Sequence, residues 1–242
     1  MNKPFNASSG APAQNRLRQL EKTDPERALL RYAESGDLAG VQRVLAGQVD
    51  VDAVLYCNSG VETVEDTALH AAAGAGHVDI VEALIRAGAE ANIRINDHET
   101  PLIHAAMNGW SQTTAALLRG GAKIDLAESF EGCTALHWAS RMGHESTVRV
   151  LLDAGADMDV EDKRGATPEE VICAQVSTGH KEYQQMYNGI AAAFREARES
   201  RRLAAENAHR EKTMLAEALK NAPVLQKEIP VGKPLRLKPR KP

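Results

Sequence analysis

The amino-acid sequence predicts an all-α solenoid, built from stacked helix pairs and followed by a long C-terminal helix. The first observation is a row of threonines at Thr67, Thr100, Thr134 and Thr167, spaced by 33, 34 and 33 residues. The second is that the same landmarks follow each of the first three: an alanine-rich apolar run, a turn with glycine, a second apolar run and another glycine. A fixed period of this length indicates a repeat array, whose units must stack because each is too small to bury both faces of its own helix pair.

Three segments carry these landmarks most clearly. They read TALHAAAGAGH from Thr67, TPLIHAAMNGW from Thr100 and TALHWASRMGH from Thr134. The pattern resembles the ankyrin repeat, whose unit runs Thr-Pro-Leu-His-x-Ala-Ala, then Gly-His, a leucine-rich helix and Gly-Ala. The resemblance covers residues 27–180. It implies a helix–turn–helix unit, β-hairpin-like loops between units and a role in binding other proteins.

The start of the array departs from the pattern. Residues 27–46 mimic a repeat in which Arg27 replaces the threonine, and Asp24-Pro25 provides a helix start. The step from Arg27 to the first threonine is 40 residues instead of 33 or 34. We expect the surplus in the connection Tyr56–Asp66, either as a functional loop or as a tolerated insertion.

The repeat pattern is also less regular at the end of the array. After Thr167-Pro168 an inner-helix pattern persists, but Gly179-His180 arrives three residues late. We therefore expect about five repeats within residues 25–180, the first and the last of them degenerate, as solvent-facing ends of an array require.

The period also assigns the core. The predicted inner-helix contacts are Leu69, Ala72, Leu102, Ala105, Leu136 and Ala139. The predicted outer-helix contacts are Ile80, Val81, Leu84, Leu117, Val148, Val150 and Leu151. Gly88, Gly121 and Gly155 follow the outer helices, where a left-handed residue ends a helix.

The chain outside the array has three predicted parts. Residues 1–24 form a disordered leader, helical near Arg16–Lys22, with a targeting peptide as the alternative. Residues 181–220 form a helix whose apolar positions 183, 187, 190, 194 and 197 dock on the last repeat as a cap. Its second half is a solvated helix or, alternatively, a coiled-coil dimer seam. Residues 221–242 form a basic, proline-rich disordered tail.

Composition excludes several classes of protein. No apolar run is long enough to span a membrane, and no hydrophobic signal core opens the chain. The three cysteines are far apart and indicate neither a disulfide framework nor a zinc site, so we expect a cytoplasmic location. Residues 27–180 hold 11 basic against 23 acidic residues, a net charge of −12, whereas residues 221–242 carry +5. An acidic array is a poor partner for nucleic acid.

The histidines are the first candidates for catalysis or metal binding. His70 and His137 occupy the fourth position of their repeats, where the resemblance implies a structural bridge between the threonine hydroxyl and the backbone of a hairpin. His104 differs, because Ile103 takes that position and His104 lies one residue further on the face that partners contact. No catalytic or phosphate-binding motif is present. We expect no enzyme activity, no cofactor and no metal.

The resemblance also implies which positions contact a partner. They lie just before each threonine and seven and eight residues after it, with His104 and Trp138 on the same face. The candidates are Asn96, Asp97, Glu99, His104, Met107, Asn108, Phe130, Glu131, Cys133, Trp138, Arg141 and Met142. The aromatic and methionine members would form an apolar centre, and Asp97, Glu99 and Glu131 an acidic rim, as in many interface hot spots.

These observations predict a non-enzymatic scaffold or adaptor that binds another protein with the concave face and hairpin tips of the array. The partner would present a basic and partly apolar surface. The alternative is a regulatory or assembly subunit that acts through its C-terminal helix and basic tail, with the repeats as a rigid mount. We expect a monomer, with a dimer through the C-terminal helix as the other possibility.

Overall fold

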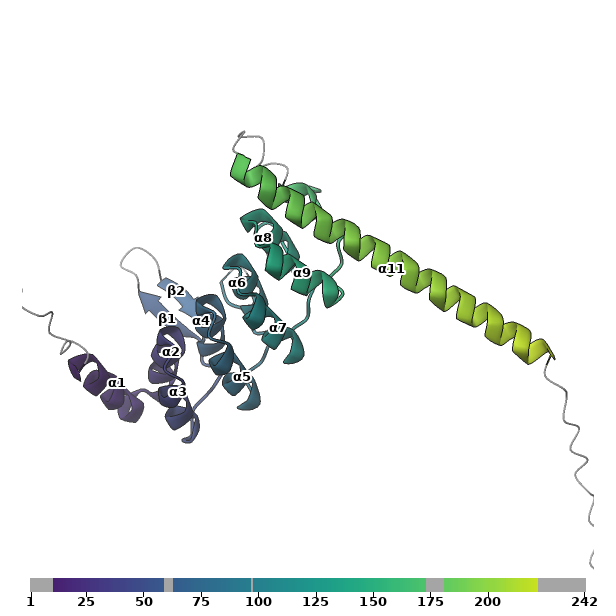
Figure 1. Cartoon of the computed structure of the whole chain (residues 1–242). Helices are drawn as coiled ribbons and strands as arrows, with labels where there is room; N and C mark the ends of the chain where they lie inside the picture. Colours follow the sequence, from purple (N-terminus) through teal and green to yellow (C-terminus); the bar gives the residue numbers. More distant parts are fainter. Residues whose placement is uncertain (1–10, 59–62, 97, 173–180, 222–242) are drawn as a thin grey trace, which may run out of the picture. The chain divides into compact units, whose positions relative to one another are not determined.

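The computed structural model describes residues 11–58, 63–96, 98–172 and 181–221 of the chain (Figure 1). The chain divides into two compact units, residues 1–198 and residues 199–242. The last helix, α11 (Lys181–Asn221), runs through the boundary between them. The predicted Gly179-His180 turn, the segment 1–10 and the tail 222–242 lie outside the described residues.

Four helix pairs make up most of the first unit. The inner row contains α2 (Pro25–Ser35), α4 (Ala68–Ala75), α6 (Pro101–Met107) and α8 (Ala135–Met142). The outer row contains α3 (Leu38–Leu45), α5 (Val78–Arg86), α7 (Ser111–Arg119) and α9 (Glu145–Asp153). Each helix packs against its pair and against the next helix of its own row (Figure 1). The predicted stack of helix pairs is confirmed.

Side-chain caps explain where the inner helices begin. Thr67, Thr100 and Thr134 are the N-cap residues of α4, α6 and α8, and each hydroxyl accepts the backbone N–H three residues later. Asp24 caps α2 in the same way, accepting the N–H of Arg27 at 3.0 Å, with Pro25 in the first turn. Each cap provides an acceptor for one of the N–H groups that the first turn leaves free.

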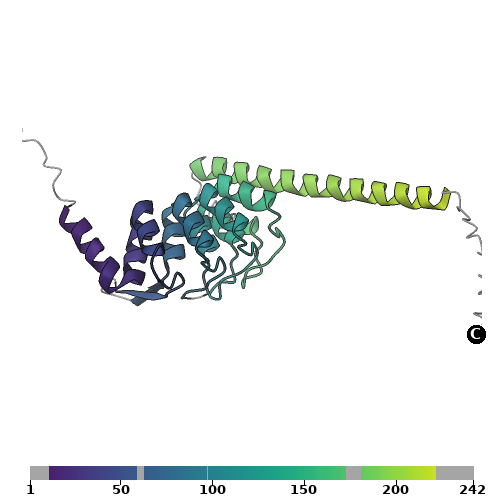
Figure 2. The same cartoon turned by 90° about the horizontal axis from the view of Figure 1, so that it is seen from below.

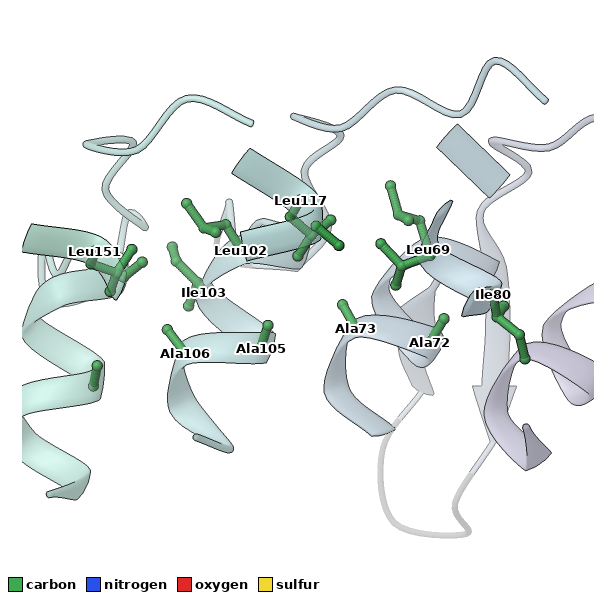
Figure 3. Packing of buried hydrophobic residues seen from close by; sticks show 14 of the residues in the cluster. Leu69, Ala72, Ala73, Ile80, Leu102, Ile103, Ala105, Ala106, Leu117 and Leu151 are labelled. Carbon is green, nitrogen blue, oxygen red and sulfur yellow. The ribbon is translucent and has the colours of Figure 1, made fainter. Parts of the chain in front are cut away.

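The core lies between the two rows and is continuous from one pair to the next. Leu69, Leu102, Leu117 and Leu151 are at most 1% exposed and extend between neighbouring pairs (Figure 3). All predicted inner-helix contacts are buried, and all predicted outer-helix contacts except Val150 are buried as well. Val150 is only partly buried, because the core stripe of α9 runs through Thr147, Val148, Leu151 and Leu152 and leaves it on the flank.

Neighbouring pairs interlock where a bulky side chain covers a glycine of the preceding turn. Gly76, in the turn between α4 and α5, has φ +79°, and a Cβ atom there would lie 2.5 Å from the ring of Trp110 in the next pair. His144 covers Gly109 in the same way. Met186 of α11 then covers Gly143, so the first part of α11 takes the position of a further repeat.

The long connection between the first two pairs is a β-hairpin. Strand β1 (Leu55–Asn58) pairs antiparallel with β2 (Thr63–Asp66), with Tyr56 opposite Glu65. The additional residues between the first and second repeats therefore lie in this hairpin, as the repeat spacing predicted. The other connections lie along the same side of the array, as Figure 2 shows, and the next one contains an isolated bridge between Ile95 and Glu99.

Helix α1 spans Ala11–Thr23, so the helix expected near Arg16–Lys22 is present but begins earlier, at residues where disorder was predicted. Leu17 and Leu20 pack against the core of the first pair. The carboxylate of Glu21 accepts the hydroxyl of Tyr32 at 2.6 Å and pairs with Arg43 at 3.0 Å. Packing and these polar contacts stabilise a helix longer than the sequence predicts.

The first part of α11 belongs to the same core. Ile190, Ala193 and Phe194 are at most 3% exposed and join the cluster formed by the helix pairs. Arg149 of α9 pairs with Glu196 at 2.6 Å. Tyr183 and Tyr187 of the predicted stripe have side chains outside the described set. In the second unit, all described side chains from Glu199 to Glu217 are exposed.

Candidate functional site

The candidate residues come from two neighbouring repeats. One group precedes or belongs to α6 and comprises Asn96, Glu99, His104, Met107 and Asn108, while Asp97 lies outside the described residues. The other group precedes or belongs to α8 and comprises Phe130, Glu131, Cys133, Trp138, Arg141 and Met142. The two groups meet where the Nε2 atom of His144 lies 3.0 Å from the carbonyl oxygen of Met107.

Glu99 and His104 form a partly buried polar pair. The Nε2 atom of His104 lies 2.8 Å from the carboxylate of Glu99, and the ring of His104 meets that of His70 edge to face at 5.1 Å. The hydrogen bond from His104 lowers the pKa of Glu99. The carboxylate of Glu99 thus already has a hydrogen-bond partner within the chain.

His70 and His137 have the structural role that the resemblance implied. The Nδ1 atom of each lies 2.9 Å from the hydroxyl of its cap threonine. The Nε2 atom of each lies 3.2 Å from a backbone oxygen of the following connection, that of Glu99 for His70 and that of Ala166 for His137. Both side chains are fully buried, and burial lowers the pKa of His70 to about 3.

Asn96 connects two hairpins. Its side-chain oxygen accepts the N–H of Glu65 at 3.2 Å, and its amide nitrogen donates to the carbonyl oxygen of Glu65 at 3.2 Å. Its own N–H lies 3.3 Å from the Glu65 carboxylate. Asn96 therefore holds its own connection against strand β2, although its side chain remains exposed.

Phe130 is the most exposed large apolar side chain among the described residues, at 74%. The loop that carries it is rigid, because the carboxylate of Glu128 is buried within it and accepts three backbone N–H groups. These belong to Phe130, to Glu131 at 2.9 Å and to Cys133 at 2.9 Å. A further tie comes from the next loop, where the N–H of Lys163 donates to the carbonyl oxygen of Glu131 at 2.8 Å.

Arg141 is the centre of a charged network under this loop. Its guanidinium pairs with Glu131, lies 4.0 Å from Asp162 and stacks 4.7 Å from the centroid of the Trp138 ring. Glu131 also pairs with Arg164 at 2.8 Å. The hydrogen bond from Arg141 holds the pKa of Glu131 below its usual value. Glu131 is therefore a bridge between two arginines and does not contribute a free negative charge.

Cys133 cannot contact a partner directly, which corrects its place among the candidates. Its side chain is fully buried, and a guanidinium nitrogen of Arg141 lies 3.3 Å from its sulfur. Burial raises the pKa of its thiol to about 12, so it stays protonated and unreactive at neutral pH. The residue before Thr134 points inward because the loop folds over it, a geometry that repeat spacing does not reveal.

Four apolar candidates differ in how much they offer to a partner. Met142 is 48% exposed, while Met107 and Trp138 are partly buried. One face of the Trp138 ring is covered by Arg141. The ion pair between Glu131 and Arg141 links the loop that carries Phe130 to the helix that carries Met142. We call Phe130, Met142, Met107 and Trp138 the Phe130 surface.

Sequence reasoning missed two buried acidic residues that shape this surface. Glu128 organises the loop of Phe130, and Asp162 accepts the N–H groups of Arg164 at 2.8 Å and Ala166 at 3.0 Å in the next loop. An acidic residue in a polar connection gives no sign in the sequence that it is buried. Only their position, six and five residues before the following threonine, could have suggested a common role.

No group of three or more metal-ligating side chains occurs among the described residues. Within the same residues, no helix combines the length and apolar character that a membrane crossing needs.

The comparisons with known proteins agree with the geometry of the stack. Residues 69–162 match the family model described as ankyrin repeats in three copies. This stretch of the chain is an ankyrin-repeat array. Ankyrin repeats are modules of protein–protein interaction and are not catalytic in themselves.

Several curated proteins resemble the ankyrin region. The chain is 31% identical over 131 residues to the transient receptor potential cation channel subfamily A member 1 homolog of Caenorhabditis elegans, a match covering 54% of this chain and 10% of that protein. It is 33% identical over 130 residues to the probable E3 ubiquitin-protein ligase XBOS31 of Oryza sativa subsp. japonica, covering 53% and 28%. The ankyrin repeat and KH domain-containing protein mask-1 of Caenorhabditis elegans is 36% identical over 130 residues, covering 53% and 5%. The match thus spans less than a third of each of these relatives.

Proposed function

We propose that the chain is a non-enzymatic scaffold or adaptor that binds another protein through the Phe130 surface. The observation that carries the proposal is an aromatic side chain, 74% exposed, on a loop whose backbone is fixed by a buried carboxylate. Exposed aromatic anchors dominate the binding energy of many interfaces. A loop that is already ordered loses little conformational entropy when a partner binds.

The surroundings of Phe130 support an interface rather than an isolated exposed residue. Met142 adds a second exposed apolar side chain, and Met107 and Trp138 of the same two repeats are partly buried. Methionine and aromatic residues are enriched at interface centres, where charged residues are depleted. The charged groups nearby, Glu131 and Arg141, are paired with each other, so covering them would not leave an unpaired charge.

The partner we propose offers an apolar pocket to Phe130 and basic groups around it. The net charge of −12 over residues 27–180 would attract a basic partner during encounter. Glu131 is paired with Arg141 and Glu99 is hydrogen-bonded to His104. We therefore attribute this attraction to the array as a whole and not to these two carboxylates. It should therefore weaken as salt concentration rises.

The test is affinity purification with three forms of the full chain: wild type, Phe130→Asp and Gln112→Asp. Gln112 is an exposed residue of the outer helix α7 and serves as the matched control for an added carboxylate. We expect at least a tenfold loss of the specifically bound protein with Phe130→Asp and no loss with Gln112→Asp. Equal recovery with all three forms would contradict the proposal.

A second candidate function rests on the other unit. All described side chains from Glu199 to Glu217 are exposed, including Leu203, Met214 and Leu215 at 47%, 63% and 62%. This supports the alternative of a regulatory or assembly subunit whose working part is the C-terminal helix with the basic tail. Deleting residues 199–242 separates the two: binding persists if the Phe130 surface is the site, and it is lost if the helix and tail are.

A further inference from the structure

The hairpin β1–β2 has an open edge that the Phe130 surface does not use. Every second residue of β1 directs its N–H and C=O away from β2. Among the described residues, β1 makes extensive contacts with β2 alone, and no backbone hydrogen bond joins Leu55–Asn58 to any segment other than β2. An unpaired strand edge is a template for a further strand.

The other edge of the hairpin is closed. The side-chain amide of Asn96 bonds both the N–H and the carbonyl oxygen of Glu65, as a neighbouring strand would. The hairpins of the array thus follow one another in a row that begins at β1. Of the two edges of this hairpin, the outward edge of β1 is therefore the one that remains open among the described residues.

The chemistry around β1 indicates what kind of strand would fit. Tyr56 is 62% exposed and Val54 is 40% exposed, so the edge carries two apolar side chains in alternate positions. The segment 50–66 contains five acidic residues and no lysine or arginine. Its described members Asp50, Asp52, Glu65 and Asp66 form no ion pair with described residues. Asp50 is exposed and Asp52 partly so, and their negative charges face no cation of the described chain, so they are the carboxylates a basic partner would meet.

We propose that β1 binds an extended, basic segment of a partner protein as an additional antiparallel or parallel strand. The main-chain groups of β1 would provide the hydrogen bonds, and Tyr56 and Val54 would contact alternate side chains of the bound segment. Lysine or arginine at the intervening positions would meet the carboxylates of Asp50 and Asp52. This site is separate from the Phe130 surface and does not depend on the proposed function.

The experiment selects peptides on the full chain with a phage library of random linear sequences, in parallel with the variant Tyr56→Ala. We expect enrichment of peptides that alternate basic and apolar residues. These peptides should bind the wild-type chain at least fivefold more tightly than Tyr56→Ala and should bind Phe130→Ala as well as wild type. Failure to enrich any peptide, or equal binding to Tyr56→Ala, would overturn the proposal.

A second measurement tests the strand geometry without altering the protein. The best peptide is synthesised with backbone N-methyl groups at odd or at even positions. In an added strand only alternate N–H groups face β1, so one set should weaken binding at least tenfold and the other should change it little. Equal effects of both sets would overturn the proposal. So would peptide binding that appears only after deletion of residues 1–10 or 222–242, since the edge would then be covered by the chain itself.

Discussion

Buried histidines hold the inner helices α4 and α8 to the connections that follow them. His70 and His137 both bridge a cap threonine and a backbone oxygen about one repeat further along the chain. Because their rings are buried and hydrogen-bonded as neutral imidazoles, protonation is unfavourable in the folded state. For each of the two residues, burial lowers the pKa.

This arrangement predicts an acid-dependent loss of stability. The pKa of His70 is about 3 in the folded chain, against an ordinary value of 6.5. Below pH 6.5 the unfolded chain takes up a proton that the folded chain does not, so the free energy of unfolding falls by about 1.4 kcal/mol per pH unit from this residue. When the free energy of unfolding is measured with urea between pH 6 and 4, it should fall by about 1.4 kcal/mol less per pH unit in His70→Gln than in wild type. The same pH dependence in both forms would mean that His70 is not the residue that takes up this proton on unfolding.

Glu128 is the residue on which the loop of Phe130 depends. Its carboxylate is 4% exposed and accepts N–H groups of Phe130, Glu131 and Cys133. Glu128→Ala leaves these donors without that acceptor and should lower the free energy of unfolding by about 2–4 kcal/mol. The control Phe130→Ala removes only an exposed side chain and should change stability by less than about 0.5 kcal/mol. Equal effects in urea unfolding would contradict this role of Glu128.

At the scale of elements, the stack depends on the turns between the two helices of each pair. Gly76 is covered by the ring of Trp110, and Gly143 by Met186. Neighbouring pairs can approach this closely only because these residues have no side chain. The glycines that follow the outer helices are different, because Gly88 has φ +100° but open space around it.

Gly76 and Gly88 therefore form a matched pair for a prediction. Both have positive φ, so an alanine at either position should destabilise the chain by about 1–2 kcal/mol through backbone strain. Only Gly76→Ala also places a Cβ atom 2.5 Å from Trp110, and this overpacking should add about 1–3 kcal/mol. Urea unfolding of the two variants measures the difference. Equal losses would show that the contact with Trp110 does not determine how the pairs pack.

The elements differ in how far the sequence predicts them. Repeat spacing located the starts of the repeats at Thr67, Thr100 and Thr134 and the core of α4 to α8, because both recur at a fixed period, although it did not identify these threonines as helix caps. Before the array, helix was expected only near Arg16–Lys22, and the full length of α1 was not predicted because Glu21 of this helix contacts Tyr32 and Arg43 in other helices. Spacing predicted a long connection before Thr67 and the family resemblance implied hairpin-like loops, but neither gave the register of β1 with β2.

The candidate site was predicted less well, for a related reason. Spacing identifies the side of the array on which a residue lies, and it correctly selected Phe130 and Met142 as exposed. Burial of Cys133 and compensation of Glu131 depend on the path of the loop, which Glu128 sets through non-repeating hydrogen bonds. Such contacts have no period and leave no pattern in a single sequence.

At the scale of the whole molecule, the array is a series of pairs, each of which contacts mainly its neighbours. Proteins of this kind have stability that is approximately a sum of repeat and interface terms. A binding surface on such a protein is formed by a few neighbouring repeats, so different partners can bind to different repeats. The Phe130 surface belongs to the repeats of α6 and α8, whereas the open edge of β1 lies between the first and second pairs.

The most direct test of partner binding at Phe130 is site-specific photo-crosslinking of the full chain. A photoreactive phenylalanine analogue replaces Phe130 in one sample and Gln112 in the other, and the chain is irradiated with the protein that co-purifies with wild type. We predict a covalent adduct from position 130 and none from position 112. An adduct from position 112 alone, or from neither position while binding persists, would contradict the assignment of this surface.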